Sequence, residues 1–348
     1  MGRNKFAVIA ICIAFVMILG QFAGIRAFVA ESSEGEGGSF AFRLINDLAG
    51  GPGAKGLQDQ ESGGATKAPD PLLAQIRDEA AKRRIAPVDA VVDRVWKAIP
   101  GYNGREVDIE LTYAKAKQQL EGAEIEYVYR ELKPKVNLDD LGAQPIYRGN
   151  PNKPMAALMI NVAWGNEYLV PMLDTLDKSK VKATFFLDGS WLKKNEEMAA
   201  EIKRRGHQIE NHAYSHPNMS QLEVTRARLE ISKTKDLLKE KLGVENRWFA
   251  PPSGDYNMQT VKLAAEQGLK TVLWTLDTVD WRNPPASSII SKIGSKVEPG
   301  TLILMHPTAS SRDALEGMIQ AIRSKGLTLG TVEQTLSPDR IEAEVPQS

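Results

Sequence analysis

Cysteine is almost absent from the chain, and histidine is scarce. The 348 residues include one cysteine, Cys12, and four histidines. Because Cys12 lies inside an apolar run near the N-terminus, no disulfide framework is possible in the folded part of the chain. A body without cysteine is compatible with export to an oxidising compartment, although it does not require export.

An excess of charge of either sign is also absent. Lys plus Arg and Asp plus Glu each number 44, so the formal net charge is zero, and no basic block appears. Because nucleic-acid-binding proteins usually carry a basic patch, this balance predicts no nucleic-acid partner. The hydrophobic fraction of 42% and the charged fraction of 25% are ordinary for a globular protein. The length fits one large domain or two moderate ones.

The most apolar run of the chain lies at its N-terminus. Arg3 and Lys5 precede an unbroken apolar stretch over residues 6–19, which is the pattern of an export signal. The stretch is short for a membrane span, and the residues after it make a poor cleavage site. A cleaved signal peptide and an uncleaved signal anchor over residues 1–30 therefore both stay open. Either predicts an exported protein, secreted or attached to the membrane through this segment.

A linker and a small module follow. Residues 31–70 are rich in glycine and polar residues, which is the composition of a flexible tether. Within residues 71–149, the spacing of apolar residues predicts helices over 72–84, 89–99 and 107–119 and a strand over 125–132. In the second helix, Val91, Val92 and Val95 would share one face. The segment has no His and no Cys, so we predict a small, mainly helical module for interaction or positioning.

From Met155 onward, short apolar runs alternate with amphipathic segments. The predicted strands cover residues 156–160, 183–187, 208–210, 248–250, 271–274, 301–305 and 327–329. The predicted helices cover residues 196–205, 222–241, 259–267 and 287–297. Repeated strand–helix alternation predicts an α/β fold with a parallel sheet, either doubly wound or closed as a barrel. In barrels the functional residues follow the C-terminal ends of the strands.

Polar residues do follow these strands. They are Asn161, His212, His216, Asp277, Asp280 and His306. The remaining histidine, His207, is expected at a solvated turn between a helix and a strand. At a spacing of four residues, His212 and His216 can present two imidazole nitrogens to one divalent ion, although a purely structural pair has the same spacing.

The runs around these residues resemble the motifs of the polysaccharide deacetylases, also called carbohydrate esterase family four or the NodB-homology domain. The sequence GHQIENHAYSHP at residues 206–217 resembles the second motif of that family. The third to fifth motifs correspond to FAPPSG at 249–254, DTVDW at 277–281 and LILMH at 302–306, and VKATFF at 181–186 resembles the segment before the second motif. Their order and spacing agree over residues 155–335. The chain is similar in particular to the divergent sporulation branch, to which we also assign the module over 71–149.

The resemblance implies a distorted (β/α) barrel over residues 153–341 and a hydrolase that removes N-acetyl groups from an N-acetylhexosamine glycan of the cell envelope. In the family, one Asp and two His hold a divalent metal, usually zinc, that polarises the acetyl carbonyl and activates water. The resemblance assigns His212 and His216 to the metal, His306 to the general acid and Asp280 to tuning that acid. It assigns Trp281, Pro252 and Leu304 to the substrate groove. Trp281 would also fit a packing role, and Pro252 would also fit a role in shaping the loop after its strand.

The first motif departs from the family pattern. Where the family has TFDDG, this chain has MINVA at residues 159–163. Asn161 therefore takes the position of the catalytic base, and Val162 takes that of the metal carboxylate. Ala250 replaces the arginine that orients the base. An amide does not act as a general base and valine offers no ligand atom, so we predict activity that is weak or absent. Glu167 and Asp188 are the nearby carboxylates that remain as substitutes.

Three functions stay open on this evidence. The first is a working deacetylase with a rearranged base and one weakly held, zinc-like divalent metal. The second is a non-catalytic glycan-binding or regulatory pseudoenzyme of the spore envelope. The third is a structural envelope protein that acts through residues 71–149. The missing base and metal carboxylate count against the first function. The retained polar and aromatic residues count against the third function. They are His212, His216, Asp280, Trp281 and His306.

Overall fold

The computed structural model describes residues 70–120 and 122–341 of the chain. The predicted signal segment, residues 1–30, and the tether up to residue 69 lie outside the described residues. The boundaries at 71–149 and 153–341 stay predictions. In the part of the chain that the structure describes, no helix combines the length and the apolar character that a membrane crossing needs.

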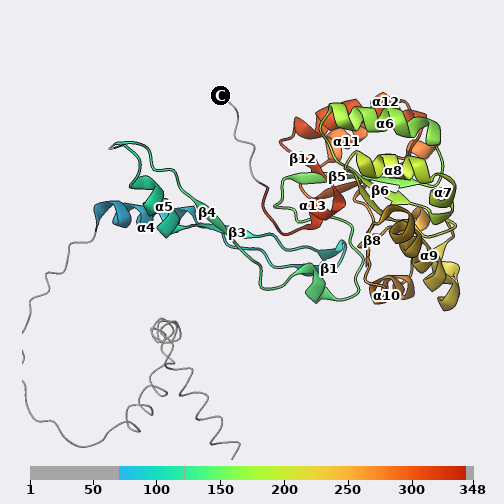
Figure 1. Cartoon of the computed structure of the whole chain (residues 1–348), viewed down its shortest axis with the longest axis horizontal. Helices are drawn as coiled ribbons and strands as arrows, with labels where there is room; N and C mark the ends of the chain where they lie inside the picture. The colour runs from blue at the N-terminus through green and yellow to red at the C-terminus, as the bar shows by residue number, and fades with distance from the viewer. Residues whose placement is uncertain (1–69, 121, 342–348) are drawn as a thin grey trace, which may run out of the picture. The chain divides into compact units, whose positions relative to one another are not determined.

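A curled sheet of eight parallel strands dominates the described residues (Figure 1). The strands are β5 (Met155–Val162), β6 (Thr184–Leu187), β7 (Gln208–Asn211), β8 (Trp248–Phe249), β9 (Lys270–Thr271), β10 (Leu276–Asp277), β11 (Thr301–Met305) and β12 (Thr328–Gly330). Their order is β10-β11-β5-β6-β7-β8-β9, with β12 paired to β5. No ladder joins β9 to β10 within residues 122–341, so the sheet is an open half-barrel. This confirms the expected distorted (β/α) barrel.

The central strand β5 explains why the barrel forms here. All eight of its residues are buried, and seven of them are apolar. A strand covered on both faces is expected to be a continuous apolar run of this kind. Ala157 and Met159 pack in the cluster on the inner face, whereas Leu158 and Ile160 pack in the cluster beneath the helices. Side chains therefore alternate between the two faces along the strand.

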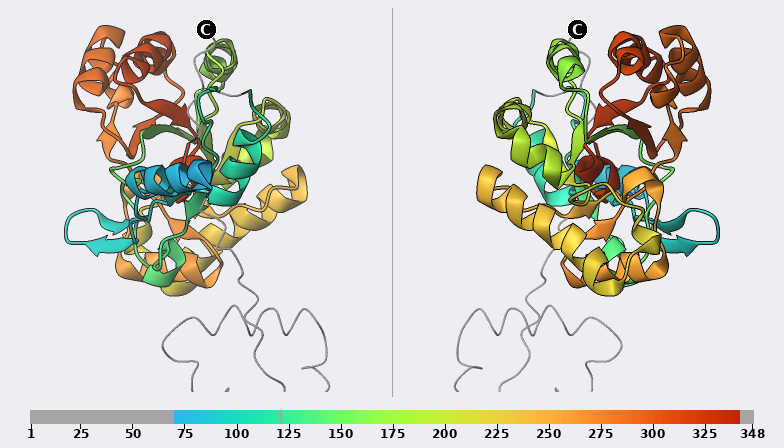
Figure 2. Two further views of the ribbon diagram at one scale, coloured as in Figure 1. Left: turned by 90° about the vertical axis from the view of Figure 1, so that its left-hand side faces the viewer. Right: turned by 90° about the vertical axis from the view of Figure 1, so that its right-hand side faces the viewer.

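Helices cover the outer face of this sheet. They are α6 (Asn166–Lys178), α7 (Gly189–Lys194), α8 (Glu196–Arg204), α9 (Val224–Leu242), α10 (Met258–Glu266), α11 (Ala286–Lys296) and α12 (Ala309–Arg323). The short helix α13 (Val332–Leu336) instead packs in the inner-face cluster through Val332 and Leu336. Helix α12 packs against both α11 and α6, and the two rotated views place α11 and α12 side by side (Figure 2). The four predicted helices correspond to α8, α9, α10 and α11, whereas α6, α7, α12 and α13 were not predicted.

The smaller part of the described chain mixes helices with antiparallel hairpins. Helices α4 (Pro71–Arg83) and α5 (Ile109–Ala116) accompany the pairs β1–β2 (Val91–Asp93, Lys97–Ile99) and β3–β4 (Gly104–Val107, Tyr129–Leu132). The prediction of a helix over 89–99 was wrong, and the module is mixed rather than mainly helical. The carboxylate of Asp93 accepts hydrogen bonds from the backbone N–H groups of Val95 and Trp96, both at 2.7 Å, and so closes a turn.

The hairpin also leaves its valines exposed. Val91, Val92 and Val95 retain 50%, 53% and 66% of their accessible surface, whereas the predicted helix would have gathered them on one face.

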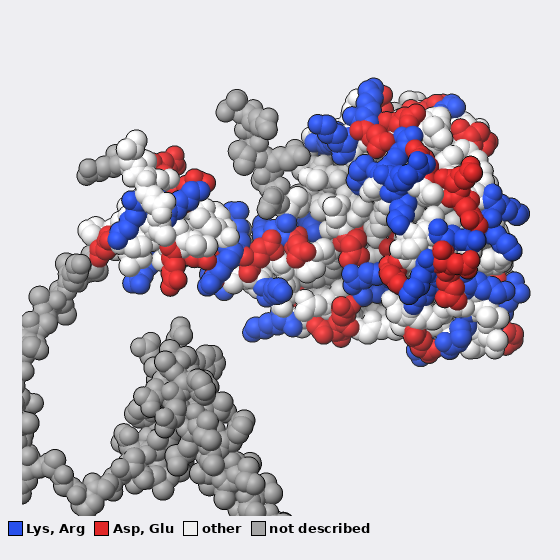
Figure 3. All heavy atoms as spheres, viewed as in Figure 1, with Lys and Arg blue, Asp and Glu red and all other residues white. Residues whose placement is uncertain are grey.

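The segment after the hairpin joins the sheet edge: the N–H of Ile146 donates to the carbonyl of Thr271 at 3.0 Å, and the N–H of Leu273 donates to the carbonyl of Ile146 at 2.7 Å. Over the face seen in Figure 3, basic and acidic side chains are interspersed.

Candidate functional site

The inner face of the sheet brings three polar side chains to the ends of adjacent strands. Asn161 lies near the end of β5, and Asp188 and His212 directly follow β6 and β7. Asn161 comes two residues after Met159, and Asp188 two residues after Phe186, both of which belong to the inner cluster. Because strand side chains alternate with a period of two, Asn161 and Asp188 point to the inner face as well.

His212 is fixed in one tautomer. It is 1% exposed, and its Nδ1 lies 2.8 Å from the carbonyl oxygen of Ala250. Since a carbonyl only accepts hydrogen bonds, Nδ1 carries the proton and Nε2 keeps its lone pair. Burial, and then the neighbouring His216, lower the pKa of His212 to about 3. The ring is therefore neutral at physiological pH, as a metal ligand must be.

His216 completes the histidine pair. Its ring centroid lies 5.1 Å from that of His212, at an interplanar angle of 72°. The loop between them includes a backbone φ of 58° at Ala213, and φ is 55° at His216 itself. Such left-handed conformations are uncommon outside glycine and cluster at functional sites. The predicted pair is thus brought together, with His212 buried and His216 exposed.

His306 and Asp280 form a second group across the barrel mouth. Asp280 is fully buried and accepts hydrogen bonds from His306 Nδ1 at 2.8 Å, from the backbone N–H of His306 at 2.6 Å and from the hydroxyl of Ser311. Burial alone would raise the pKa of Asp280, but these donors, chiefly His306, hold it below its ordinary value. The carboxylate therefore holds the imidazole ring through Nδ1, and Nε2 forms no hydrogen bond with Asp280.

Two tryptophans give this group an exposed aromatic border. Trp281, beside Asp280, is 52% exposed, and the guanidinium of Arg282 lies 4.6 Å from the centre of its ring. Trp164 is 45% exposed and stacks on His306 with centroids 5.9 Å apart and an interplanar angle of 11°. The sequence alone did not single out Trp164 as a functional residue.

Gly165 fixes the position of Trp164. Its φ is 83°, and a Cβ at this position would lie 2.0 Å from the carbonyl oxygen of Pro307. Only glycine lets the loop after β5 lie this closely on the residue that follows His306. The other two predicted groove residues, Leu304 in β11 and Pro252 in the turn η4 (Pro252–Gly254), are buried. Among these groove residues, the exposed surface therefore belongs mainly to Trp164 and Trp281.

The positions that depart from the family pattern are buried. Asn161 is 3% exposed, and its Oδ1 finds no hydrogen-bond partner among the described residues. Val162 is fully buried in the cluster beneath the helices. The carbonyl of Ala250 holds His212, and its methyl side chain cannot orient a base. The chemistry of the first motif is thus replaced by an amide and a core side chain.

The two substitute carboxylates differ sharply. Glu167 is exposed in the first turn of α6. Asp188 is 1% exposed, and its Oδ1 accepts hydrogen bonds from the backbone N–H of Trp191 at 2.8 Å and from the hydroxyl of Ser190 at 2.6 Å. Burial raises the pKa of Asp188 despite these donors. Only Asp188 therefore belongs to the inner face of the barrel.

The expectation for His207 was wrong. Its ring is 6% exposed rather than solvated, and Nδ1 accepts a hydrogen bond from the backbone N–H of Ala183 at 3.2 Å. The ring also packs edge-on against Phe185, with centroids 5.1 Å apart. Burial lowers the pKa of His207 to about 4. The residue lies at the start of β7, at the opposite end of the strand from His212, so it is a core residue.

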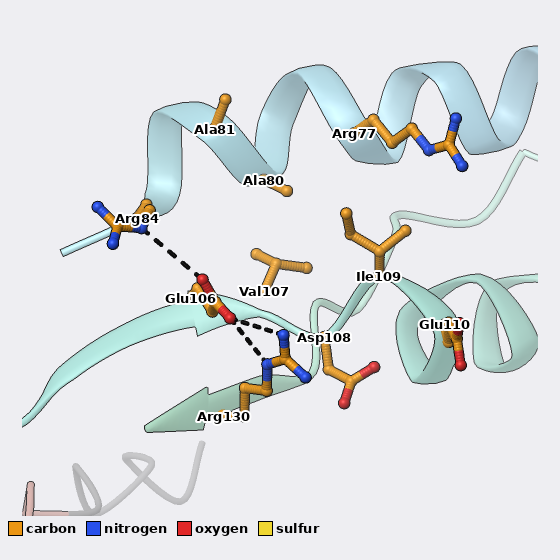
Figure 4. Close-up of a pocket in the computed structure, with 10 residues that line it drawn as sticks. All are labelled: Arg77, Ala80, Ala81, Arg84, Glu106, Val107, Asp108, Ile109, Glu110 and Arg130. Atoms are coloured by element: carbon orange, nitrogen blue, oxygen red, sulfur yellow. Dashed lines mark hydrogen bonds and ion pairs between the residues drawn. The ribbon is translucent and has the colours of Figure 1, made fainter. Parts of the chain in front are cut away.

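A hollow of about 560 Å³ lies in the smaller part of the chain, between α4 and the segment that leads from β3 into α5 (Figure 4). Glu106 forms ion pairs there with Arg84 at 3.7 Å and Arg130 at 2.7 Å. Its charged side chains thus largely satisfy one another, and its lining includes no histidine. The hollow offers no catalytic set.

The fit to a family metal is partial. His212 and His216 offer two nitrogen ligands, but within residues 70–120 and 122–341 no three His, Cys, Asp or Glu side chains form a ready ligand cluster. Structural and catalytic zinc sites usually have three or four protein ligands. The unpartnered oxygens of Asn161 and Asp188 are the remaining donors on the same face.

Comparison with known proteins agrees with this geometry. Residues 148–272 match the family model described as polysaccharide deacetylase. The chain is 34% identical, over 197 residues, to the peptidoglycan-N-acetylglucosamine deacetylase of Bacillus cereus, and the match covers 54% of this chain and 72% of that protein. The chain belongs to the polysaccharide deacetylase family. The family assignment from the sequence motifs is thereby confirmed.

Other relatives match more of this deacetylase-family chain. An uncharacterised Bacillus subtilis protein, YlxY, is 44% identical over 286 residues, which are 82% of this chain and 90% of that one. The crystal structure of BA3943, described as a family-four pseudoenzyme from Bacillus anthracis, superposes with a TM-score of 0.73 at 41% identity and covers 78% of this chain and 97% of that one. A mutant of BA3943, described as having restored enzymatic activity, superposes equally well at 40% identity, with coverages of 78% and 100%.

Proposed function

We propose that this deacetylase-family protein is a glycan-binding pseudoenzyme that recognises an N-acetylhexosamine polymer of the envelope, such as peptidoglycan, and hydrolyses it weakly or not at all. The observation that carries the proposal is the end of β5. There Asn161 takes the position of the base and the buried Val162 that of the metal carboxylate. The similarity to a pseudoenzyme over most of the chain supports the same conclusion.

Hydrolysis fails for a definite chemical reason. Amide hydrolysis needs a base to take a proton from water, a charge that stabilises the oxyanion, and an acid for the leaving amine. Asn161 cannot accept that proton, because the lone pair of an amide nitrogen is delocalised. His306 and Asp280 retain the geometry of the acid, but an acid without a base contributes only part of the catalysis.

Glycan binding needs none of the lost groups. Trp164 and Trp281 present exposed rings beside His306, and large rigid aromatic surfaces contribute strongly to binding. The buried hydrogen bonds among Asp280, Ser311 and His306 keep the His306 ring oriented as a polar contact, next to the stacked ring of Trp164. The site thus combines an aromatic border with a fixed hydrogen-bonding group, which suits a ring that has an apolar face and polar substituents.

A divalent, zinc-like ion is proposed as a weakly held cofactor. His212 and His216 would hold it, and when bound it would polarise an acetyl carbonyl. The fixed tautomer of His212 supports this assignment, because Nδ1 is committed to Ala250. With the carboxylate of β5 lost, affinity is expected to be lower than in relatives that keep all three ligands.

We also propose that the protein is exported, either secreted or held at the membrane through residues 6–19, and that it acts in the spore envelope. The charged start and apolar run of the N-terminus support export, and the resemblance to the sporulation branch supports the location. Cell fractionation of the producing organism, combined with N-terminal sequencing, tests both points. A cytosolic pool with an intact N-terminus would contradict them.

Restoring the lost groups tests the reason given for inactivity. We expect Asn161→Asp to gain measurable, metal-dependent acetate release from peptidoglycan fragments, and adding Ala250→Arg to increase it. Asn161→Asp combined with Val162→Asp restores both aspartates but places a charge in the core, so it is expected to be destabilised. The mutant of BA3943 with restored activity supports this design.

The control compares binding with hydrolysis. The unmodified full chain should sediment with insoluble peptidoglycan, and Asn161→Asp should sediment to a similar extent, since no aromatic contact has changed. His216→Ala in the Asn161→Asp background removes a proposed metal ligand and should abolish the regained activity. If the unmodified chain fails to bind any N-acetylhexosamine polymer, the proposed function is wrong.

A further inference from the structure

Two buried oxygen atoms at the end of the sheet have no hydrogen-bond partner among the residues that the structure describes. They are Oδ1 of Asn161 and Oδ2 of Asp188, in residues that are 3% and 1% exposed. Unpaired buried polar atoms are uncommon in native proteins, and each calls for an explanation such as a water or an ion. Asp188 follows the strand next to that of His212, and Asn161 lies one strand further along the same inner face, which points to a ligand at this place.

The strand register places Asp188 beside His212. The last ladder pair of β6 and β7 joins Leu187 to Asn211, so the next pair is Asp188 with His212. Two hydrogen bonds extend the ladder across this pair: the N–H of His212 donates to Leu187 at 3.1 Å, and the N–H of Gly189 donates to Ala213 at 2.9 Å. Cβ atoms of neighbouring strands on one face are about 5 Å apart, so the two side chains are direct neighbours.

Asp188 also borders the position of the lost carboxylate. Its backbone N–H donates to the carbonyl of Val162 at 2.9 Å, so it stands next to the residue that occupies the metal-carboxylate position. Val162 itself turns toward the outer cluster. The Asp188 carboxylate therefore lies on the inner face beside this position, where the side chain of Val162 does not reach.

The two oxygens of Asp188 have different surroundings. Oδ1 caps α7 through Trp191 and also accepts from Ser190, whereas Oδ2 has no partner in the described part of the chain. A buried charge is costly unless it is paired or bound to a metal. The ring of His216 lies 5.1 Å, centroid to centroid, from that of His212, which is the neighbour of Asp188 on the adjacent strand.

We propose that Asp188 supplies the carboxylate of a divalent-cation site with His212 and His216, so that the acidic ligand has moved from β5 to β6. Two imidazoles and one carboxylate form a donor set that suits zinc. Oδ1 of Asn161 is a further neutral oxygen on the same face. Because these side chains do not yet form a closed cluster, they must shift to bind the ion, which lowers the affinity.

This inference rests on the proposed function in one respect, the assignment of His212 and His216 as metal ligands. Its test uses no glycan. The untagged full chain is freed of metal with a chelator, then titrated with Zn²⁺ in competition with a chromophoric chelator. Co²⁺ is titrated in parallel, because its visible absorption reports the number and geometry of the ligands. We expect one zinc equivalent whose binding is lost in His212→Ala and His216→Ala.

Asp188→Asn is the decisive variant. Its side-chain oxygen still caps α7, but its charge is lost. We expect zinc affinity to fall at least about tenfold, which is the lower end of the effect of removing an outer partner of a metal site. The matched control is Asp108→Asn, since Oδ1 of Asp108 caps α5 by accepting from Leu111 at 3.0 Å. That control should bind zinc as the unmodified chain does.

Each result decides the inference. Equal zinc affinity in Asp188→Asn and the unmodified chain would overturn it, as would the absence of zinc binding by the unmodified chain. If Asp188→Asn does not fold, Asp188→Ser replaces it, because serine also caps helices and has no carboxylate. Zinc binding that depends on Asp188 without any glycan binding would support this inference and contradict the proposed function, so the two fail separately.

Discussion

The most informative stability experiment concerns Asp280, because its retention has two explanations. It could be kept to orient His306 for a ligand, or to hold the fold together. Asp280 is fully buried and accepts three hydrogen bonds, from the ring and backbone of His306 and from Ser311. These bonds join the loop after β10 to the loop after β11 and to the first turn of α12. Asp280→Asn removes the charge and one acceptor without changing the size of the side chain.

The expected loss follows from those contacts. A hydrogen bond to a charged group contributes about 1.5–3 kcal/mol, and an asparagine cannot accept from all three donors because its nitrogen is itself a donor. The asparagine nitrogen then faces His306 Nδ1, which must pass its proton to Nε2 to stay paired. Because the remaining bonds also lose the negative charge, the free energy of unfolding should fall by roughly 3 kcal/mol, the upper end for one hydrogen bond to a charged group. His306→Ala removes the ring donor to Oδ1 of Asp280 but keeps the backbone and Ser311 donors, so it should cost about 1.5 kcal/mol, the lower end for a hydrogen bond to a charged group.

Urea unfolding of the full chain, followed by tryptophan fluorescence, measures both losses. Peptidoglycan sedimentation of the folded variants then separates the two explanations. We expect His306→Ala to weaken glycan binding more than its small effect on stability suggests. A loss below 1 kcal/mol for Asp280→Asn, or a larger loss for His306→Ala than for Asp280→Asn, would refute this assignment of roles.

Three further predictions concern single residues. Burial raises the pKa of Glu210 to about 7 from 4.5, so between these pH values the folded protein keeps this proton and the unfolded chain loses it. Protonation of Glu210 therefore stabilises the fold by about 3 kcal/mol at low pH. This stabilisation should be lost as the pH rises from about 4.5 to about 7. The difference between the urea midpoints of the unmodified chain and Glu210→Gln across this window measures it. Gly165→Ala should lower the free energy of unfolding by at least about 2 kcal/mol, measured in the same way, because of its φ of 83° and the close carbonyl of Pro307. Trp281→Ala and Trp164→Ala should each weaken glycan sedimentation about threefold to tenfold without a comparable loss of stability.

The barrel was predictable because its strands carry strong local signals. β5 and β11 are continuous apolar runs between turn residues, and the structure gives them nearly the predicted bounds. The residues after the strands were predictable for the same reason, since parallel strands bring their C-terminal ends to one edge. His212 and His306 therefore lie where the motif pattern indicated.

Predictions from local sequence patterns were wrong where the same residues are compatible with two structures. The apolar spacing of residues 89–99 fits a helix, but Asp93 closes a turn and the β-branched valines favour strands. Helices α6 and α12 are amphipathic with buried faces, yet the sequence patterns did not lead us to predict them. For His207, a polar residue near a predicted turn indicated solvent exposure, but the pairing of β6 and β7 buries it.

The rest of the site depends on contacts between distant segments. Trp164 belongs to the site because it stacks on His306, and no sequence spacing encodes that contact. Asp188 becomes relevant only when the register of β6 and β7 places it opposite His212. Motifs therefore predicted which residues lie at the strand ends, whereas the interactions among them required the structure.

The central claim is that the unmodified site binds glycan and hydrolyses it weakly or not at all. The most direct test is acetate release by the unmodified full chain from peptidoglycan fragments, with zinc, cobalt or manganese added, on a sample already shown to sediment with peptidoglycan. We expect acetate at the level of a blank without protein, because Asn161 supplies no base. Metal-dependent acetate release well above that blank would contradict the account and would make Asp188 the first residue to examine as an alternative base.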